Sequence, residues 1–312
     1  MSMSGIYGRA DRDESIATIH AALDAGVTLV DTGDFYGMGH NELLLAEALA
    51  GRPRDEVVIS VKFGAQRGPD ATWLGYDARP AAVKTAAAYS LQRLRSDHID
   101  IYRPARLDRR VPIEETVGAI AELVQAGYVR HIGLSEVGPE TIRRAAAVHP
   151  ICDLQIEYSL ISRGIESAIL PTCRDLEIAI TAYGVLSRGL ISGHYRADGD
   201  ATAGDMRGRM PRFGGENLRH NLALVEELRA VADDKGAAVA QIAIAWVRSR
   251  GEDIVPLIGA RRRDQLDEAL GALELELSAE DLERIEQAVP RGAARGDRYG
   301  APQMADLDSE QG

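Results

Sequence analysis

Short runs of β-branched and other apolar residues alternate along this chain with longer stretches of helical period, and this alternation limits the folds available to it. The short runs predict strands at residues 27–31, 57–62, 99–103, 130–135, 154–157, 178–183 and 254–258. They are mostly continuous apolar segments, as in strands that a parallel sheet buries on both faces. Stretches rich in Ala, Leu and Glu predict helices at residues 14–25, 79–94, 113–125 and 217–234. Repeated strand–helix units predict an α/β fold, either a doubly wound sheet or a (β/α)8 barrel.

The number of strands bears on the choice of fold. A (β/α)8 barrel has eight strands, whereas seven are predicted here. The helix predicted at 14–25 should itself follow a strand, and the natural place for that strand is before residue 5. We therefore expect a (β/α)8 TIM barrel that lacks its first strand, which a longer natural chain would supply. No linker or low-complexity segment divides the chain, so residues 1–312 are expected to form one domain, with a long Gly- and Arg-rich loop at 187–216.

Two polar residues mark expected helix starts. Asn217 and Ser278 each precede a stretch of helical period, and both residue types are favoured at the N-cap because their side chains accept a hydrogen bond from the first free backbone amides. The sequence therefore predicts that one helix begins just after Asn217 and another just after Ser278.

The balance of charges excludes some classes of partner. The chain has 48 acidic and 36 basic side chains, which give a net charge of −12. A nucleic-acid partner is not expected, because phosphate binding requires the opposite sign of charge. No apolar run approaches the ~18 residues of a membrane-spanning helix, and we expect a cytoplasmic protein. The 7 His and 2 Cys residues show no metal-ligand spacing, so no metal site is expected.

Three polar side chains follow two neighbouring predicted strands. Asp31 ends one strand, Tyr36 follows in the next loop, and Lys62 ends the second strand. In a (β/α)8 barrel the active site is built from strand ends and loops at this face. A Lys near a carboxylate and a phenol lowers the pKa of the phenol and lets it act as a general acid. The same residues also fit a structural Asp31–Lys62 ion pair with Tyr36 as a packing residue.

Longer motifs around these residues resemble the aldo-keto reductases, a family of NADP-dependent enzymes built on a (β/α)8 barrel. The resemblance rests on VDTGDFYG at residues 30–37 and SVKFG at 60–64, and it continues at DIY (100–102), VPIEET (111–116) and GYVRHIGLS (127–135). QIEYS (155–159), AYGVLSRG (182–189) and VPLIG (255–259) complete it. The function that the resemblance implies is reduction of an aldehyde or ketone to an alcohol with NADPH, so the expected partner is a small-molecule carbonyl substrate.

The resemblance also assigns catalytic roles. It implies Tyr36 as the proton donor, Lys62 as the cation that lowers the pKa of Tyr36, and Asp31 as the carboxylate that supports Lys62. The fourth member of the family's catalytic set, a His, is replaced by Ala105. Losing a hydrogen-bond donor near a reacting carbonyl costs about two to three decades in rate in other enzymes. An alternative function is therefore an NADP-binding sensor or scaffold with weak turnover or none. Ala105 and Trp73 are expected to line the substrate pocket.

The same resemblance implies an NADPH site along the strand ends. Ser135 and Gln155 match positions that bind the nicotinamide carboxamide, and Tyr183 matches the aromatic residue that stacks on the nicotinamide ring. Further cofactor contacts, from the pyrophosphate to the adenine, are implied at Leu186, Ser187, Arg188, Gly189, Gly259, Arg261, Arg262 and Glu268. Residues 187–216 are then a cofactor-covering loop. The motif GDRY at 296–299 is similar to the tail of some members and predicts an ordered C-terminal cap over 291–312.

Three positions depart from the family pattern at this cofactor site. Glu136 stands where many members have Asn, Gln265 replaces a frequent Arg, and Ala269 replaces an Asn that contacts adenine. The basic run at 261–263 nevertheless favours NADP over NAD. The same run leaves open a third interpretation, an unrelated phosphate-binding barrel that uses these three Arg residues.

Overall fold

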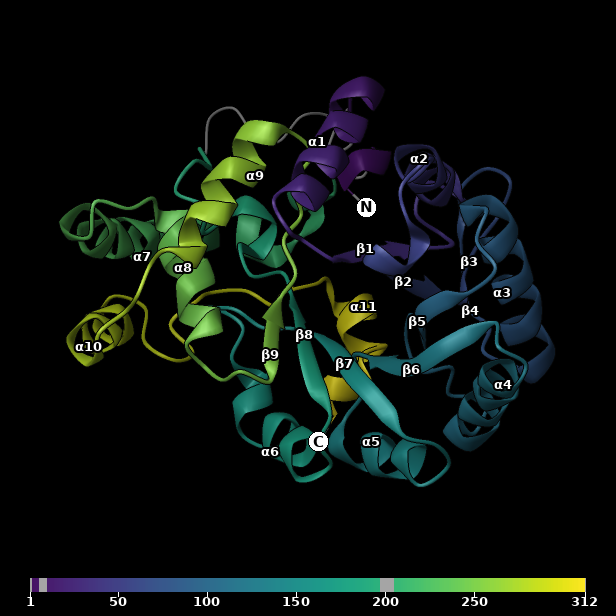
Figure 1. Ribbon diagram of the computed structural model, residues 1–312. Coiled ribbons are helices and arrows are strands. Elements are labelled where there is room, and N and C mark those ends of the chain that lie inside the picture. The colour runs from purple at the N-terminus through teal and green to yellow at the C-terminus, as the bar shows by residue number, and fades with distance from the viewer. Residues whose placement is uncertain (1, 6–9, 197–204, 312) are drawn as a thin grey trace.

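The strands of the computed structural model form one curved sheet, and most of the helices lie around its outer face (Figure 1). The structure describes residues 2–5, 10–196 and 205–311. The strands are β1 (Leu29–Gly33), β2 (Val58–Phe63), β3 (Ala65–Arg67), β4 (Trp73–Tyr76), β5 (Ile99–Pro104), β6 (Val129–Ser135), β7 (Ile151–Glu157), β8 (Ala179–Tyr183) and β9 (Ile254–Pro256). The helices are α1 (Arg12–Asp24), α2 (His40–Ala48), α3 (Pro80–Leu94), α4 (Ile113–Gln125), α5 (Pro139–Ala146), α6 (Ile169–Asp175), α7 (Gly215–Asp234), α8 (Val239–Arg248), α9 (Arg263–Leu270), α10 (Ala279–Ala288) and α11 (Ala301–Ala305). Within these described ranges, no helix has the length and apolar character needed to cross a membrane.

The main sheet is parallel and keeps the order of the chain. Its strand order is β1-β2-β5-β6-β7-β8-β9, so each strand pairs with the next one of the sheet. That order is typical of a (β/α)8 barrel, and it excludes the doubly wound alternative, in which the order reverses at a switch point. Because the strands run in the same direction, their carboxyl ends meet at one edge. In this register Gly33 lies opposite Lys62, and Lys62 lies opposite Arg103.

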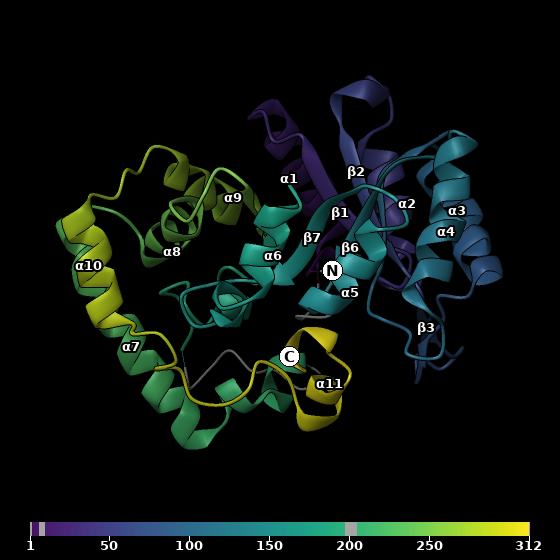
Figure 2. The same cartoon turned by 90° about the horizontal axis from the view of Figure 1, so that it is seen from below.

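The sheet is open between its first and last strands. Among the described residues, β1 pairs only with β2 and β9 pairs only with β8, as expected for a barrel without its first strand. Helices α1 and α9 flank this opening side by side (Figure 1), and an ion pair of 3.0 Å between Glu14 and Arg263 joins them. Helices α7 and α10 pack against each other on the far side of α8 (Figure 2).

Apolar side chains fill the space between the sheet and the helices and hold the strand ends in place. Ile59, Ile132 and Leu154, from three different strands, are at most 1% exposed. Each such side chain contributes about 1.5–3 kcal/mol relative to leaving it in water. Trp246 of α8 is 1% exposed and lies 5.5 Å from the ring of Tyr158. The carboxyl edge of the sheet therefore rests on a well-packed support.

One of the two predicted helix caps is confirmed and the other is wrong. Ser278 precedes α10, and its hydroxyl accepts a hydrogen bond of 3.1 Å from the backbone amide of Asp281. Helix α7 instead begins at Gly215, so Asn217 lies inside its first turn. The side-chain amide of Asn217 donates to the carbonyl of Pro211 at 3.0 Å, and this bond holds the preceding loop rather than a free helix amide.

Several predicted strand boundaries are also wrong, and the largest difference is at β7, which begins at Ile151 rather than at residue 154. The first strand begins at Leu29 rather than at residue 27, because the amide of Val27 donates to the carbonyl of Ala22 at the end of α1 and is unavailable for pairing. The last strand ends at Pro256 rather than at residue 258. Proline has no amide hydrogen to donate to a neighbouring strand, which favours a strand end there.

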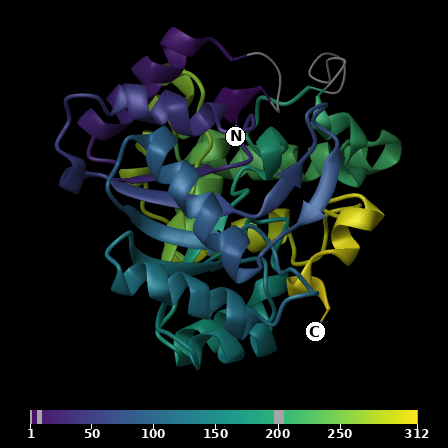
Figure 3. The same cartoon turned by 90° about the vertical axis from the view of Figure 1, so that its right-hand side faces the viewer.

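Two further segments lie over the carboxyl edge of the sheet. Strands β3 and β4 form an antiparallel hairpin directly after β2, where the sequence analysis assigns no strand. The C-terminal segment folds back with α11 and a short 3-10 helix at Asp308–Glu310. Figure 3, seen from the side of α3 and α4, shows this segment at the same end of the molecule as the hairpin, and residues of both line one cavity.

Candidate active site

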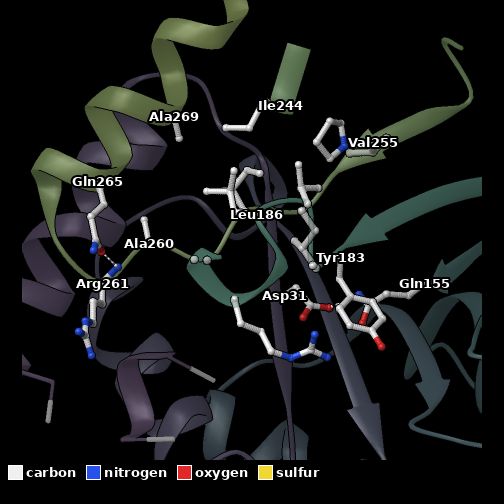
Figure 4. Close-up of a pocket in the computed structure, with 18 of the residues that line it drawn as sticks. Asp31, Gln155, Tyr183, Leu186, Ile244, Val255, Ala260, Arg261, Gln265 and Ala269 are labelled. Carbon is white, nitrogen blue, oxygen red and sulfur yellow. Dashed lines mark hydrogen bonds between the residues drawn. The ribbon is translucent and has the colours of Figure 1, made fainter. Parts of the chain in front are cut away.

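A large cavity opens at the carboxyl ends of the strands. Its volume is about 2150 Å³, and it includes the opening between β1 and β9, where Leu29, Ile244 and Val255 line it. Figure 4 shows Asp31 and Tyr183 close together at one end, whereas Arg261 lies toward α9 at the other. The cavity is therefore an elongated groove with a polar inner end.

The structure brings nearly all of the residues expected from the sequence to this one cavity. The lining includes Asp31, Tyr36, Lys62, Trp73, Ala105, Ser135, Gln155, Tyr183, Leu186, Arg188, Gly189, Gly259, Arg261, Arg262 and Glu268. Ser187 is the exception, since it is fully buried and does not line the cavity. Its φ of 44° and the φ of 59° at Arg188 place two non-glycine residues in the left-handed region, where backbone strain commonly marks functional loops.

Asp31 and Lys62 form a buried ion pair at the inner end. The carboxylate and the ammonium are 2.5 Å apart, with side chains 8% and 5% exposed. Burial alone would raise the pKa of Asp31, but the charges of Lys62 and Arg103 outweigh it and hold that pKa below its usual value. Burial lowers the pKa of Lys62, and Asp31 opposes that change. Gln155 and Ser60 also donate to Asp31, at 2.7 and 3.1 Å, so donors from β2 and β7 fix its orientation.

Tyr36 packs against this ion pair. The Lys62 ammonium lies 5.0 Å from the centre of the Tyr36 ring, and Tyr36 is 6% exposed. A tight turn after β1 sets this position, because the amide of Tyr36 donates to the carbonyl of Gly33 at 3.0 Å. A Cβ at Gly33 would meet the Tyr36 ring and the Lys62 carbonyl at 3.3 Å. Glycine thus permits the close approach of the phenol to the ammonium.

Ala105 follows β5 beside the same end of the cavity. It is 3% exposed, and its amide donates to the carbonyl of Phe63 at 2.8 Å. Its methyl side chain supplies no hydrogen bond there. Trp73 reaches the cavity from β4 and is 45% exposed, with its ring 4.8 Å from that of Tyr76. These residues make one wall of the inner end apolar and aromatic.

Ser135, Gln155 and Tyr183 lie on adjacent strands. Ser135 pairs with Gln155 across β6 and β7. The buried Ser135 hydroxyl has no hydrogen-bond partner among the described residues, so it is available to a ligand. The Tyr183 hydroxyl donates to Glu136 at 2.7 Å and lies 2.9 Å from that of Tyr299. Burial and then the Glu136 charge raise the pKa of Tyr183 well above its usual value, which leaves this phenol protonated.

Glu136 ties the C-terminal segment to the sheet. Arg298 donates to both of its oxygens, at 2.8 and 2.5 Å, and Ser309 donates at 2.7 Å. Burial opposes ionisation of Glu136, but the Arg298 guanidinium outweighs it and holds the pKa of Glu136 far below its usual value. The φ of Glu136 is 54°. The sequence alone shows Glu136 only as a departure from the family pattern, because its partner Arg298 lies 162 residues away.

The outer end of the cavity lies beside the Arg side chains at 261–263, two of which have carboxylate partners. Arg188, which donates to Glu157 at 3.0 Å, belongs to the inner end, because it lies 4.6 Å from the centre of the Tyr299 ring. Arg262 pairs with Asp264 at 2.7 Å, and the amide of Arg261 donates to the Gln265 side chain at 3.2 Å, as Figure 4 shows. Arg263 is used in the pair with Glu14 described above, and Glu268 lies 2.8 Å from His194. Arg261 and Arg262 therefore line the groove, whereas Arg263 bridges two helices.

Comparison with known proteins places this site in a family. The model of the "Aldo/keto reductase family" matches residues 1–290. A "Probable aldo-keto reductase 1" from Glycine max is 42% identical over 302 residues, which are 96% of this chain and 86% of that protein. The chain belongs to the aldo/keto reductase family. The resemblance drawn from the sequence motifs is thus confirmed, and the interpretation as an unrelated phosphate-binding barrel is wrong.

Solved aldo/keto reductases share the fold. A glycerol dehydrogenase from Gluconobacter oxydans superposes with a TM-score of 0.86 at 30% identity, covering 95% of this chain and 91% of that one. An aldo/keto reductase from Klebsiella pneumoniae, solved in complex with NADP and acetate, has a TM-score of 0.73 at 27% identity and covers 93% and 89%. These similarities extend over nearly the whole chain and support the (β/α)8 barrel class.

Proposed function

We propose that this aldo/keto reductase reduces an aldehyde or ketone to an alcohol with NADPH, and that Tyr36 is the proton donor. The observation that carries the proposal is the buried Lys62 ammonium, which lies between the Asp31 carboxylate and the Tyr36 ring. A free phenol has a pKa of about 10 and is a poor acid at neutral pH. A cation beside it stabilises the phenolate and so makes the proton easier to give up.

The lining of the cavity fits NADPH. The free hydroxyl of Ser135 suits the carboxamide of a nicotinamide, and the ring of Tyr183 offers a surface for stacking. Arg261 and Arg262 line the far end and suit a phosphate. One groove therefore contains both the residues suited to the nicotinamide and those suited to a phosphate. The solved relative from Klebsiella pneumoniae that binds NADP supports the same assignment. When bound, NADPH supplies the hydride that forms the new C–H bond at the carbonyl carbon.

The residues of the chain then perform the proton chemistry. Tyr36 donates its hydroxyl proton to the carbonyl oxygen, so that the O–H bond of the alcohol forms as the C=O double bond is lost. Lys62 stabilises the phenolate left on Tyr36, and Asp31 keeps Lys62 charged despite burial. A proton from water in the open cavity restores the phenol. Hydrogen bonds from Gln155 and Ser60 keep Asp31 oriented through the cycle.

A second candidate function is an NADP-binding sensor or scaffold, and Ala105 favours it. The methyl group offers no donor to the carbonyl oxygen, and the missing interaction corresponds to about 2.7–4 kcal/mol of transition-state stabilisation in other enzymes. The complete Asp31–Lys62–Tyr36 arrangement favours the reductase, because a sensor would have no need for a polarised phenol.

The two functions are separated by measuring NADPH binding and NADPH oxidation on the same protein. Oxidation is followed at 340 nm against aldehydes, ketones and quinones, and binding is followed by quenching of intrinsic fluorescence. The reductase is supported by turnover that disappears in Tyr36→Phe while NADPH still binds. Tight NADPH binding with no turnover of any carbonyl would support the sensor instead.

A further inference from the structure

Arg106 is a cation of the inner cavity that has no carboxylate partner in the described part of the chain. It follows Ala105 directly and lines the cavity with Tyr36 and Lys62. Its guanidinium donates to the carbonyl of Ala105 at 2.6 Å. No carboxylate of the described residues lies within 4 Å of it, whereas Lys62, Arg188 and Arg298 each form such an ion pair.

The surroundings keep Arg106 charged. Burial alone would lower its pKa, but the phenols of Tyr183 and Tyr299 and the Glu136 carboxylate raise the pKa above the usual value for Arg. Tyr76 of the hairpin lines the same cavity. A charge-assisted hydrogen bond to a guanidinium is stronger in a partly desolvated pocket than on an exposed surface.

The charges at this end of the cavity leave a local positive excess. Glu136 is saturated by Arg298 and Ser309, and Asp31 is held by Lys62 and two other donors. Among the described residues Arg106 is therefore a cation that forms no ion pair of its own, in a protein whose net charge is −12. A small anion entering here meets an attractive site within an otherwise acidic molecule.

We propose that Arg106 binds a carboxylate of the substrate, so that this reductase acts on carbonyl compounds that carry a carboxylate. The inference rests on the function proposed above. Arg106 lines the same cavity as Tyr36 and Lys62, so a substrate that carries both groups can place its carbonyl at Tyr36 and its carboxylate at Arg106.

A matched pair of substrates tests this specificity. The probes are 4-carboxybenzaldehyde and its methyl ester, which differ mainly in charge, and the measured quantity is kcat/KM with NADPH for each. The wild type is expected to prefer the acid by about 10- to 100-fold, as for a hydrogen bond to a charged group. Arg106→Gln is expected to remove this preference through a higher KM for the acid, and Arg106→Lys to restore part of it.

A nearby control separates local recognition from the net charge of the protein. Arg109→Gln removes the same charge three residues further on, from an exposed side chain outside the cavity, and is expected to keep the preference for the acid. A wild type that reduces the ester as well as the acid would overturn the inference and leave the proposed function standing. So would an equal preference in wild type and Arg106→Gln.

A binding measurement tests Arg106 even if neither carbonyl is turned over, a result that would count against the proposed function itself. Benzoate is titrated into the NADP complex of the wild type and of Arg106→Gln. The inference is supported if the Kd for benzoate rises about tenfold or more in the variant. It is overturned if the two Kd values agree.

Discussion

The buried carboxyl of Asp34 gives a sharp prediction about stability and pH. Asp34 lies in the loop after β1, and its Oδ1 is buried without a partner among the described residues, as is the Oε1 of Glu42. Burial, followed by the Glu42 charge, raises the pKa of Asp34 from 3.8 to about 7, although the Arg93 charge opposes this rise. Tyr102 of β5 also faces the two carboxyls. Deprotonation of Asp34 is therefore unfavourable in the folded state.

The size and sign of the effect follow from the two pKa values. Because the folded protein holds this proton more tightly than the unfolded chain, stability from this group is greatest below about pH 4 and is lost as the pH rises to about 7. A change of about 3 in pKa corresponds to about 4 kcal/mol in total, of which about 3 kcal/mol is lost between pH 5 and pH 8. Asp34→Asn keeps the shape of the side chain without the charge. The unfolding free energy of Asp34→Asn, relative to that of the wild type, is therefore expected to rise by about 3 kcal/mol from pH 5 to pH 8.

The assay is urea unfolding followed by tryptophan fluorescence, at pH 5 and at pH 8, for wild type and Asp34→Asn. The quantity compared is the difference in unfolding free energy between the two proteins at each pH. Asp13→Asn is the control, because that side chain is 91% exposed and its replacement is expected to give the same difference at both pH values. The reasoning is refuted if the difference between Asp34→Asn and wild type is also the same at both.

Other substitutions test the cavity. Ala105→His is expected to raise kcat for aldehydes about tenfold or more, because it restores a donor near the carbonyl oxygen; a lower kcat would show that substrate fills that space. Glu136→Gln removes one carboxylate from the buried Arg298, which keeps Glu310 at 2.8 Å and Glu157 at 3.5 Å, so we expect a loss of about 1–3 kcal/mol in unfolding free energy and faster tryptic cleavage of the C-terminal segment. Wild-type cleavage rates would contradict this. Arg261→Ala is expected to raise the KM for NADPH about tenfold and leave the KM for NADH unchanged; an equal change for both would exclude a phosphate contact.

The parts of the site that could be predicted from sequence are those set by local pattern. Asp31 and Lys62 end neighbouring apolar runs, and parallel pairing brings such ends together, so their meeting follows once the fold class is known. The motifs that indicate the family are local as well, since most of them consist of a strand end and the loop that follows it.

The parts that were missed depend on distant contacts or weak patterns. The pair between Glu136 and Arg298 joins a strand end to the C-terminal segment, and no local signal connects two residues so far apart. Strands β3 and β4 have exposed residues on their outer side and a turn around Gly68 and Asp70, so their sequence lacks the apolar run of a buried strand. The unpaired state of Arg106 likewise becomes visible only when every nearby carboxylate is placed.

The most direct test of the account is the rate of hydride transfer from bound NADPH in a single turnover. It is measured at 340 nm with an aldehyde that the wild type reduces, in wild type and in Tyr36→Phe, with the Kd for NADPH determined on the same samples. Since a positioned general acid contributes about 100- to 10 000-fold, the account predicts a rate lowered by that factor with a nearly unchanged Kd. An equal rate in the two proteins would contradict Tyr36 as the proton donor.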